Sequence, residues 1–163
     1  MGALCEESIA CAVKALFDEK TSEMITKVND NEEETDHMEH DIEALCMKLL
    51  LHQQPVAKDL RCVSSALKMI SDMERIGDQA DDIAEILLCR AGRPLSAGDT
   101  LRDMARATIR MVSESVDAYV RQDVDLAQQV IAADDEVDGY FDRIKAHLID
   151  RIAKDVDLSL IHI

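Results

Sequence analysis

An all-α fold is predicted by three features of this 163-residue chain. Aromatic residues make up 2% of the chain and Trp is absent, so Leu, Ile, Val, Met and Ala must form the core. Such side chains suit helices packed on helices better than a β-sandwich. Only two Pro and five Gly occur, and apolar residues recur at helical spacing along most of the chain. We therefore expect long helices joined by short connections.

Two helices are expected before the first proline. The first is predicted at residues 1 to about 28, because its apolar residues recur at helical spacing. The Asn-Asp-Asn stretch at 29–31 is expected to end it, since these residue types favour caps and turns. Asp30 is then the expected N-cap of a second helix at 31–52, whose first turn is rich in acids.

Three further helices are expected. Pro55, a residue favoured in the first helical turn, is expected to begin the third helix, which runs to about Arg90. The stretch 91–98, with its Gly and Pro, is the predicted linker, and Asp99 is the predicted N-cap of the fourth helix. The last two helices are expected at 100–121 and 124–154. The expected domains are a first repeat at 1–90, the linker, and a partial second repeat at 99–163.

An internal repeat relates the two halves of the chain. An ungapped shift of 102 residues lays the acidic stretch 32–36 on 134–138, and it superimposes similar residues elsewhere: Phe17 on Tyr119, Val28 on Val130, Ile42 on Ile144 and Ala44 on Ala146. The fourth and fifth helices are therefore interpreted as a second copy of the first two. A copy of the third would begin near Asp157, six residues before Ile163, so the second bundle is expected to be incomplete.

A row of carboxylates continues an apolar stripe of the expected third helix. The stripe starts with Leu60, Val63, Leu67 and Ile70 and continues in the same line with Glu74, Asp78, Asp81 and Glu85. A second stripe is expected to hold this helix to the core: Met69, Met73, Ile76, Ala80, Ile83 and Leu87. Gly77, beside the acids, costs ~1 kcal/mol against Ala in a helix interior, which indicates the close approach of another helix or of a ligand.

Glu32 and Asp36 are expected to meet Glu74 and Asp78. A short connection near Gln54 makes the second and third helices antiparallel. Counted from Gln54, the two acidic pairs are 18–22 and 20–24 residues away, so at ~1.5 Å per residue they reach the same height within about one turn. Carboxylates at one height repel one another unless a cation joins them. Because oxygen-rich clusters suit Mg, Mn, Fe or Zn, a metal site is predicted here.

The composition narrows the classes of partner. A net charge of −16 disfavours nucleic acid and anionic membranes and favours metal cations or basic protein surfaces. No apolar run reaches the ~18 residues of a membrane span, and no secretory segment opens the chain. The five cysteines have no C-x-x-C spacing and are expected to be reduced and mostly buried, as in a cytosolic protein.

Two other interpretations stand beside the metal site. In the first, the acidic stripes are solvated faces, and the chain is a plain helical protein-interaction module without metal. In the second, Glu34-Thr-Asp-His37 supplies the E-x-x-H motif of a di-iron carboxylate oxidase, although no other histidine follows a Glu by three residues to supply the second copy. A basic stripe is expected to pair with acids of a neighbouring helix or to contact an anion: Arg102, Arg106 and Arg110.

The stretch E-R-I-G-D-Q-A-D-D-I-A-E at 74–85 resembles the signature of the PhoU family, bacterial regulators of phosphate uptake and of the phosphate-starvation response. Residues 1–16 and 54–61 also resemble that family's first and third helices. The resemblance implies two repeated three-helix bundles with iron or zinc clusters, manganese and magnesium being alternatives, at E/D-x-x-x-D motifs. The matching motifs are Glu32–Asp36, Glu74–Asp78 and Asp134–Asp138.

The same resemblance implies a non-enzymatic regulator that acts through the ATP-binding subunit of the phosphate transporter and through the phosphate-sensing histidine kinase. It implies a cytoplasmic location, with peripheral attachment to the membrane through the transporter. The sequence departs from the family in having fewer residues before the opening Met-Gly and in lacking the final helix with its fourth motif. A homodimer is expected because the apolar stripes of the last two helices have no third helix to cover them.

Overall fold

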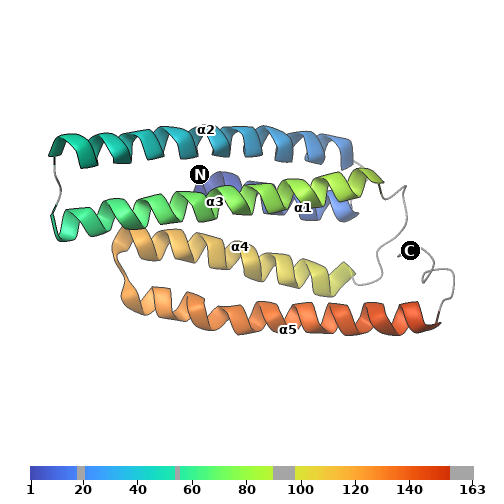
Figure 1. The fold of residues 1–163 in the computed structure, drawn as a ribbon. Helices are drawn as coiled ribbons and strands as arrows, with labels where there is room; N and C mark the ends of the chain where they lie inside the picture. Colours follow the sequence, from blue (N-terminus) through green and yellow to red (C-terminus); the bar gives the residue numbers. More distant parts are fainter. Residues whose placement is uncertain (18–20, 54–55, 90–97, 155–163) are drawn as a thin grey trace. The chain divides into compact units, whose positions relative to one another are not determined.

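Five helices make up the fold in the computed structural model, which describes residues 1–17, 21–53, 56–89 and 98–154 (Figure 1). They are α1 (Gly2–Phe17), α2 (Thr21–Gln53), α3 (Lys58–Cys89), α4 (Gly98–Arg121) and α5 (Val124–Lys154). No strand occurs among these residues, and the predicted all-α class is confirmed. None of the described helices is both long enough and apolar enough to cross a bilayer.

The chain divides into two compact units, Met1–Gly92 and Arg93–Ile163. In the first unit α1, α2 and α3 all pack on one another, and in the second unit α4 packs on α5. Most of the predicted linker lies outside the described residues. The fourth helix begins at Gly98, so Asp99 lies in its first turn rather than at the N-cap, where it accepts a hydrogen bond from Arg102 at 3.2 Å.

The predicted break at 29–31 is wrong, because α1 ends at Phe17 and α2 runs through these residues from Thr21. Asn31 is only 4% exposed, and its side-chain amide donates a hydrogen bond to Glu7 of α1 at 3.3 Å. A neighbouring helix therefore satisfies the polar side chain that the sequence pattern assigned to a cap. Asp30, the expected N-cap, is an exposed residue inside α2.

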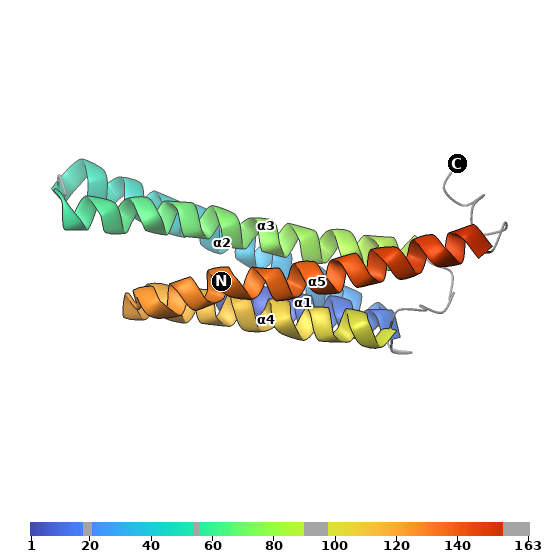
Figure 2. The same ribbon diagram turned by 90° about the horizontal axis from the view of Figure 1, so that it is seen from below.

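The helices α2 and α3 run antiparallel and side by side in both views (Figures 1 and 2). Their register is set by two contacts: Gly77 packs against Thr35, and the Ser71 hydroxyl donates a hydrogen bond to Glu39 at 2.9 Å. The predicted start of the third helix at Pro55 lies outside the described residues, and α3 begins at Lys58. The connection is therefore short, as expected.

The buried face of α3 agrees only in part with the predicted apolar stripe. At two positions the buried residue is the one that follows the predicted residue in the sequence. The buried residues of this face follow a three-four spacing: Ile70, Met73, Gly77, Ala80, Ala84 and Leu87. The prediction placed Met73, Ala80 and Leu87 correctly, whereas Ile83 is 41% exposed. Gly77 and Ala84 occupy inward positions because α1 and α2 both pack against this face, which leaves little room for larger side chains. On the α1 side, the buried Cys5 thiol donates to the Met73 carbonyl at 3.3 Å.

The helices α4 and α5 form an antiparallel hairpin. Asp123 is the N-cap of α5, since its side chain accepts a hydrogen bond from the Leu126 backbone at 3.0 Å. The preceding residue, Gln122, ends α4 with a left-handed φ of 54°. The predicted basic stripe splits in two: Arg102 and Arg106 pair with acids of their own helix, and Arg110 pairs with Glu136 of α5 at 2.8 Å.

Candidate metal centre

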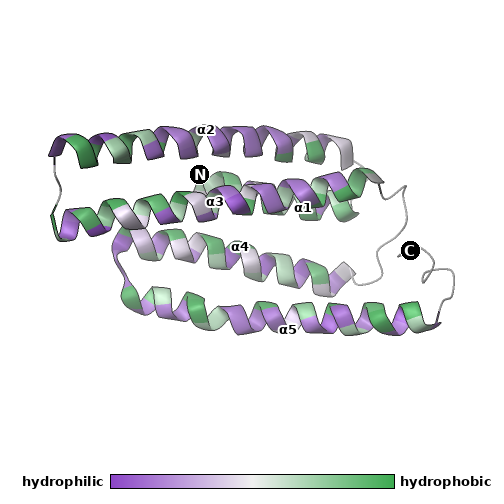
Figure 3. Cartoon of the chain, in the orientation of Figure 1, coloured by the Kyte–Doolittle hydropathy of each residue, from purple (hydrophilic) through white to green (hydrophobic). Residues whose placement is uncertain are grey.

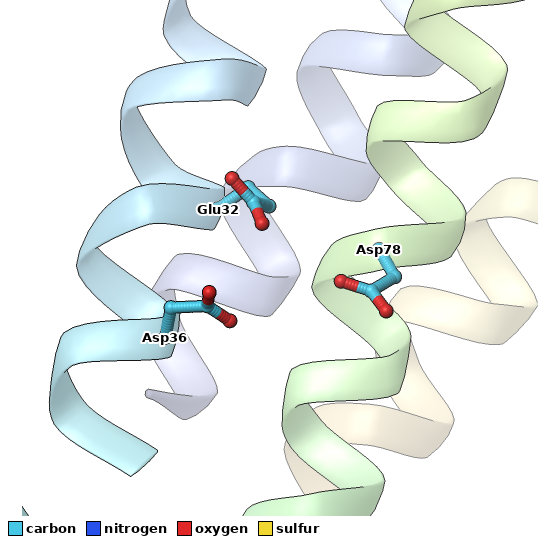
Figure 4. A group of neighbouring side chains, drawn as sticks. All are labelled: Glu32, Asp36 and Asp78. Atoms are coloured by element: carbon cyan, nitrogen blue, oxygen red, sulfur yellow. The ribbon is translucent and has the colours of Figure 1, made fainter. Parts of the chain in front are cut away.

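Three of the predicted carboxylates meet between α2 and α3. One oxygen each of Glu32, Asp36 and Asp78 lies within 4.8 Å of the other two, and all three residues are half-buried. Figure 4 shows Glu32 and Asp36 on successive turns of α2, pointing toward α3, and Asp78 pointing back toward them. The middle of α2 is correspondingly hydrophilic, and its hydrophobic segments lie toward the two ends of the helix (Figure 3). Among the described residues, no other group of three metal-ligating side chains lies as close together.

The helix register explains why these three side chains meet. Glu32 and Asp36 are four residues apart and so share one face of α2. Thr35 packs on Gly77 and the helices are antiparallel, so Asp36 and Asp78 lie one residue to either side of this contact, which at ~1.5 Å per residue is ~3 Å apart in height. Because Gly77 has no side chain, α2 approaches closely there, and the flanking carboxylates lie at the edge of the interface, where they are only partly covered.

The group is electrostatically strained when no cation is bound. Burial is the largest cause that raises the pKa of Glu32 above its usual value, followed by the negative charges of Asp36, Asp81 and Asp78. No ion pair in the described part of the chain involves any residue of the group. A cation bound among these oxygens offsets the repulsion and favours the ionised form of each carboxylate.

Glu74 lies beside the group of three rather than within it. The pKa of its carboxyl is raised, first by burial, then by the charges of Asp78, Glu39 and Asp36 and by a side-chain hydrogen bond with Asp78. The negative charges of the site therefore act on Glu74, and its interaction with Asp78 links it to one member of the group. Glu39 lies at the same end of the acidic row as Glu74, and it accepts the hydrogen bond from Ser71.

Asp81 lies outside the group of three and was not in the predicted ligand set, but its charge acts on Glu32. One of its oxygens, Oδ1, is buried and has no hydrogen-bond partner. The pKa of its carboxyl is raised, first by burial and then by the charges of Glu85, Asp82 and Asp78. The sequence placed it on the acidic line of the third helix, and the spacing of three residues from Asp78 was the signal that it shares that face.

The remaining predicted ligands, Asp134 and Asp138, are not brought to this group. They lie on α5 in the second unit, and both are exposed. The E-x-x-H residues are not part of it either: Glu34 and His37 are exposed, and His37 Nδ1 lies 2.6 Å from the Glu33 carbonyl oxygen of its own helix. The group is therefore made of carboxylates alone.

A family model described as the PhoU domain matches residues 1–87 and 101–163. The chain belongs to the PhoU family. It is 33% identical over 156 residues to the phosphate-specific transport system accessory protein PhoU homolog of Aquifex aeolicus, and 34% identical over 157 residues to that of Pseudomonas aeruginosa. Each match takes in 95% of this chain, but 70% of the Aquifex protein and 64% of the Pseudomonas protein. The PhoU protein of Escherichia coli is 30% identical, again over 95% of this chain and 64% of its own length.

A solved structure agrees with the family assignment. The crystal structure of PhoU from Pseudomonas aeruginosa superimposes with a TM-score of 0.89 at 33% identity, covering 96% of this chain and 76% of that one. The helical fold of this PhoU chain is therefore that of its family.

The donor set of this PhoU chain fits a hard or borderline cation. Three carboxylates supply up to six oxygens, the ligand type that Mg, Mn and ferrous or ferric iron prefer, and zinc also accepts carboxylate oxygen. The buried, unpartnered oxygen of Asp81 is a second sign of fit, because a buried anionic oxygen requires a hydrogen-bond donor or a cation.

Proposed function

We propose that this PhoU-family chain is a non-enzymatic regulator of phosphate uptake that binds metal between α2 and α3. The observation that carries the metal site is the meeting of Glu32, Asp36 and Asp78 from two helices, half-buried and in no ion pair with a basic side chain of the described residues. These three residues are the proposed ligands, with Glu74 at the edge. Iron or zinc is the proposed metal, and manganese or magnesium suits the same oxygens. Bound there, the metal joins α2 to α3 and offsets the repulsion of their acidic faces.

The proposed partners are proteins of the phosphate system: the ATP-binding subunit of the transporter and the phosphate-sensing histidine kinase. The support is the name of the relatives, which are accessory proteins of the phosphate-specific transport system. With a net charge of −16, the chain repels the phosphates of DNA, so we propose that any effect on transcription passes through a protein partner. We place its action on the cytoplasmic side, at the membrane through the transporter.

Metal binding is tested by thermal melting of the metal-free protein with and without added Mn²⁺, Fe²⁺ or Zn²⁺. A ligand that binds the folded state alone stabilises it by about 2.7 kcal/mol at one hundred times its Kd. The double variant Glu32→Gln, Asp78→Asn is expected to lose this gain. The matched control Glu33→Gln, Asp82→Asn removes two exposed acids from the same helices and is expected to keep it. If none of the three metals changes the melting temperature of the wild-type protein, the metal site is contradicted. A plain helical protein-interaction module is then the better-supported function.

We also propose that the chain self-associates through the α4–α5 hairpin. Large apolar side chains are exposed on α5, among them Val124, Phe141 and Ile131, the last 74% exposed. Spacing of seven and ten residues puts these three on one helix face, and Asp134 and Asp138 lie on the same face. Sedimentation velocity at tens of micromolar decides: a monomer contradicts the proposal, and a dimer that Ile131→Lys dissociates supports it.

A further inference from the structure

One side-chain oxygen of Asp81 is buried in the first unit and forms no hydrogen bond. Among the described residues, Asp81 Oδ1 is the only buried side-chain oxygen or nitrogen without a hydrogen-bond partner. Native structures rarely leave such an atom unsatisfied, and those that do commonly hold an ion or a functional group there. Uncompensated, this anionic oxygen destabilises the fold, and none of the described residues supplies the partner that would compensate it.

The helix register places Asp81 on the Glu32 side of the acidic row. Thr35 faces Gly77, and the helices are antiparallel, so one turn back along α2 corresponds to one turn forward along α3. Glu32 is therefore level with the segment between Asp78 and Asp81. The charges agree with this placement, because the charge of Asp81 raises the pKa of Glu32 more than the charge of Asp78 does.

No basic side chain of the described residues neutralises this end of the row. Lys27, the basic residue one turn before Asn31 on α2, pairs with Glu7 of α1 at 3.4 Å. On α3, Arg75 and Lys68 both pair with Asp72. The charges that raise the pKa of Asp81 are those of Glu85, Asp82 and Asp78, all negative, and the charge of Asp81 in turn raises the pKa of Glu32 on α2.

We infer that Asp81 is a further metal ligand, which extends the centre one turn along α3 and binds the cation together with Glu32 and Asp78. The inference rests on the proposed metal site and adds to it a residue outside the E/D-x-x-x-D pattern. Asp81 stands beyond the group of oxygens that lie within 4.8 Å of one another, on the side of Glu32. Because a carboxylate has two oxygens, Glu32 can bind toward Asp36 with one and toward Asp81 with the other.

The test compares Asp81→Asn with Asp82→Asn. Both substitutions remove one negative charge from adjacent positions of α3, but Asp82 is exposed and forms no part of the acidic row. Mn²⁺ binding is measured by calorimetry, and melting temperature is measured with and without Mn²⁺. For Asp81→Asn we expect a higher melting temperature without metal, because repulsion is removed, and an Mn²⁺ Kd at least about tenfold weaker, which corresponds to about 1.4 kcal/mol. Asp82→Asn removes an exposed charge that also acts on Asp81, so it is expected to raise the melting temperature less than Asp81→Asn does and to keep the wild-type Mn²⁺ Kd.

The sign of the change in melting temperature without metal distinguishes a metal ligand from a purely structural residue. A structural role for Asp81 predicts a lower melting temperature without metal and an unchanged Mn²⁺ Kd, and that result overturns the inference. Asp81→Glu, which keeps the carboxylate, is expected to bind Mn²⁺ more tightly than Asp81→Asn, and it serves as the second variant if the first is unstable. Wild-type binding with an unchanged Kd in both variants overturns the role of Asp81 alone. Absence of wild-type binding overturns the metal centre itself and this inference with it.

Discussion

Thr35 of α2 packs against Gly77 of α3, with Thr35 Cγ2 3.7 Å from the position that a Cβ atom at residue 77 would occupy. This contact relates the heights of the two acidic rows, since Asp36 and Asp78 each lie one residue away from it, in opposite directions along the antiparallel helices. Thr35 itself is buried, and its hydroxyl donates to the Asn31 carbonyl at 2.8 Å. A threonine that satisfies its own hydroxyl within the helix thus presents only its methyl group to α3.

Gly77→Ala is expected to leave the first unit intact and to stabilise it. A distance of 3.7 Å is ordinary van der Waals contact, so the added methyl group fits, and Ala gains up to ~1 kcal/mol over Gly in a helix interior. Gly77→Val adds atoms that must push α2 away, with an expected loss of about 1–3 kcal/mol. Urea unfolding of the metal-free protein measures both. At Gly139 of α5 nothing lies within 4 Å, so Gly139→Val is the control and is expected to cause no such loss.

The stability of the metal-free protein is expected to fall as pH rises. The folded state raises the pKa of Glu32, Glu74 and Asp81 above the ordinary 4.5 of Glu and 3.8 of Asp, so it holds protons that the unfolded chain has released. The stabilisation is fully present below those ordinary values and is lost as pH rises through the raised pKa values. Urea midpoints between about pH 4 and pH 8, with chelator present, measure the decline.

The control for that prediction separates the site from the overall negative charge of the chain. The triple variant Glu32→Gln, Glu74→Gln, Asp81→Asn is expected to flatten the pH dependence. A second triple variant changes the net charge equally at exposed positions that do not act on these three groups, and it is expected to keep the dependence: Glu34→Gln, Asp41→Asn and Glu43→Gln. Equal slopes in the two variants contradict a local origin.

Asn31→Asp is expected to destabilise the first unit. Asn31 is 4% exposed and donates to Glu7, which also pairs with Lys27. The substitution removes the donor and sets a buried carboxylate against Glu7, with an expected loss of about 1–3 kcal/mol or more. Asn29→Asp makes the same chemical change at an exposed position two residues earlier and is expected to be nearly neutral. Urea unfolding measures the difference.

The all-α class and the convergence of the acids could be predicted because both depend on local regularities. Helical spacing is visible in one helix at a time, and a tight connection fixes the relative heights of two helices from residue counts alone. Residue counting from Gln54 therefore brought Glu32, Asp36 and Asp78 together to within one turn. Glu74 lies one turn away from the group of three, which is the error expected of such counting.

The end of the first helix could not be predicted from residue type alone, since a buried Asn31 and a capping asparagine look the same in sequence. The internal repeat contained the missing information. Shifting the break at Gln122–Asp123 back by 102 residues puts it at 20–21, and Thr21, where α2 begins, then matches the N-cap Asp123. The close approach of a helix at Gly77 was among the expectations, whereas the core position of Ala84 was missed for a different reason. Hydrophobicity favours Ile76 and Ile83, whereas the close approach of two neighbouring helices, a tertiary property, selects the smaller side chains.

Neutralising Asp134 and Asp138 is expected to leave the metal response of the first unit unchanged. Both carboxylates are exposed on one helix, and no facing carboxylate of the described residues joins them in a group of three. Two exposed acids at this spacing hold a hard cation weakly, because water supplies most of its ligands. Asp134→Asn, Asp138→Asn is therefore expected to show the wild-type gain in melting temperature at low Mn²⁺. Isothermal titration adds a second readout, since a loss of the tightest binding step in this variant contradicts the assignment of that step to Glu32, Asp36 and Asp78. If the wild-type dimer shows a second, weaker binding step and the dimer of this variant lacks it, Asp134 and Asp138 belong to a site between two copies of the chain.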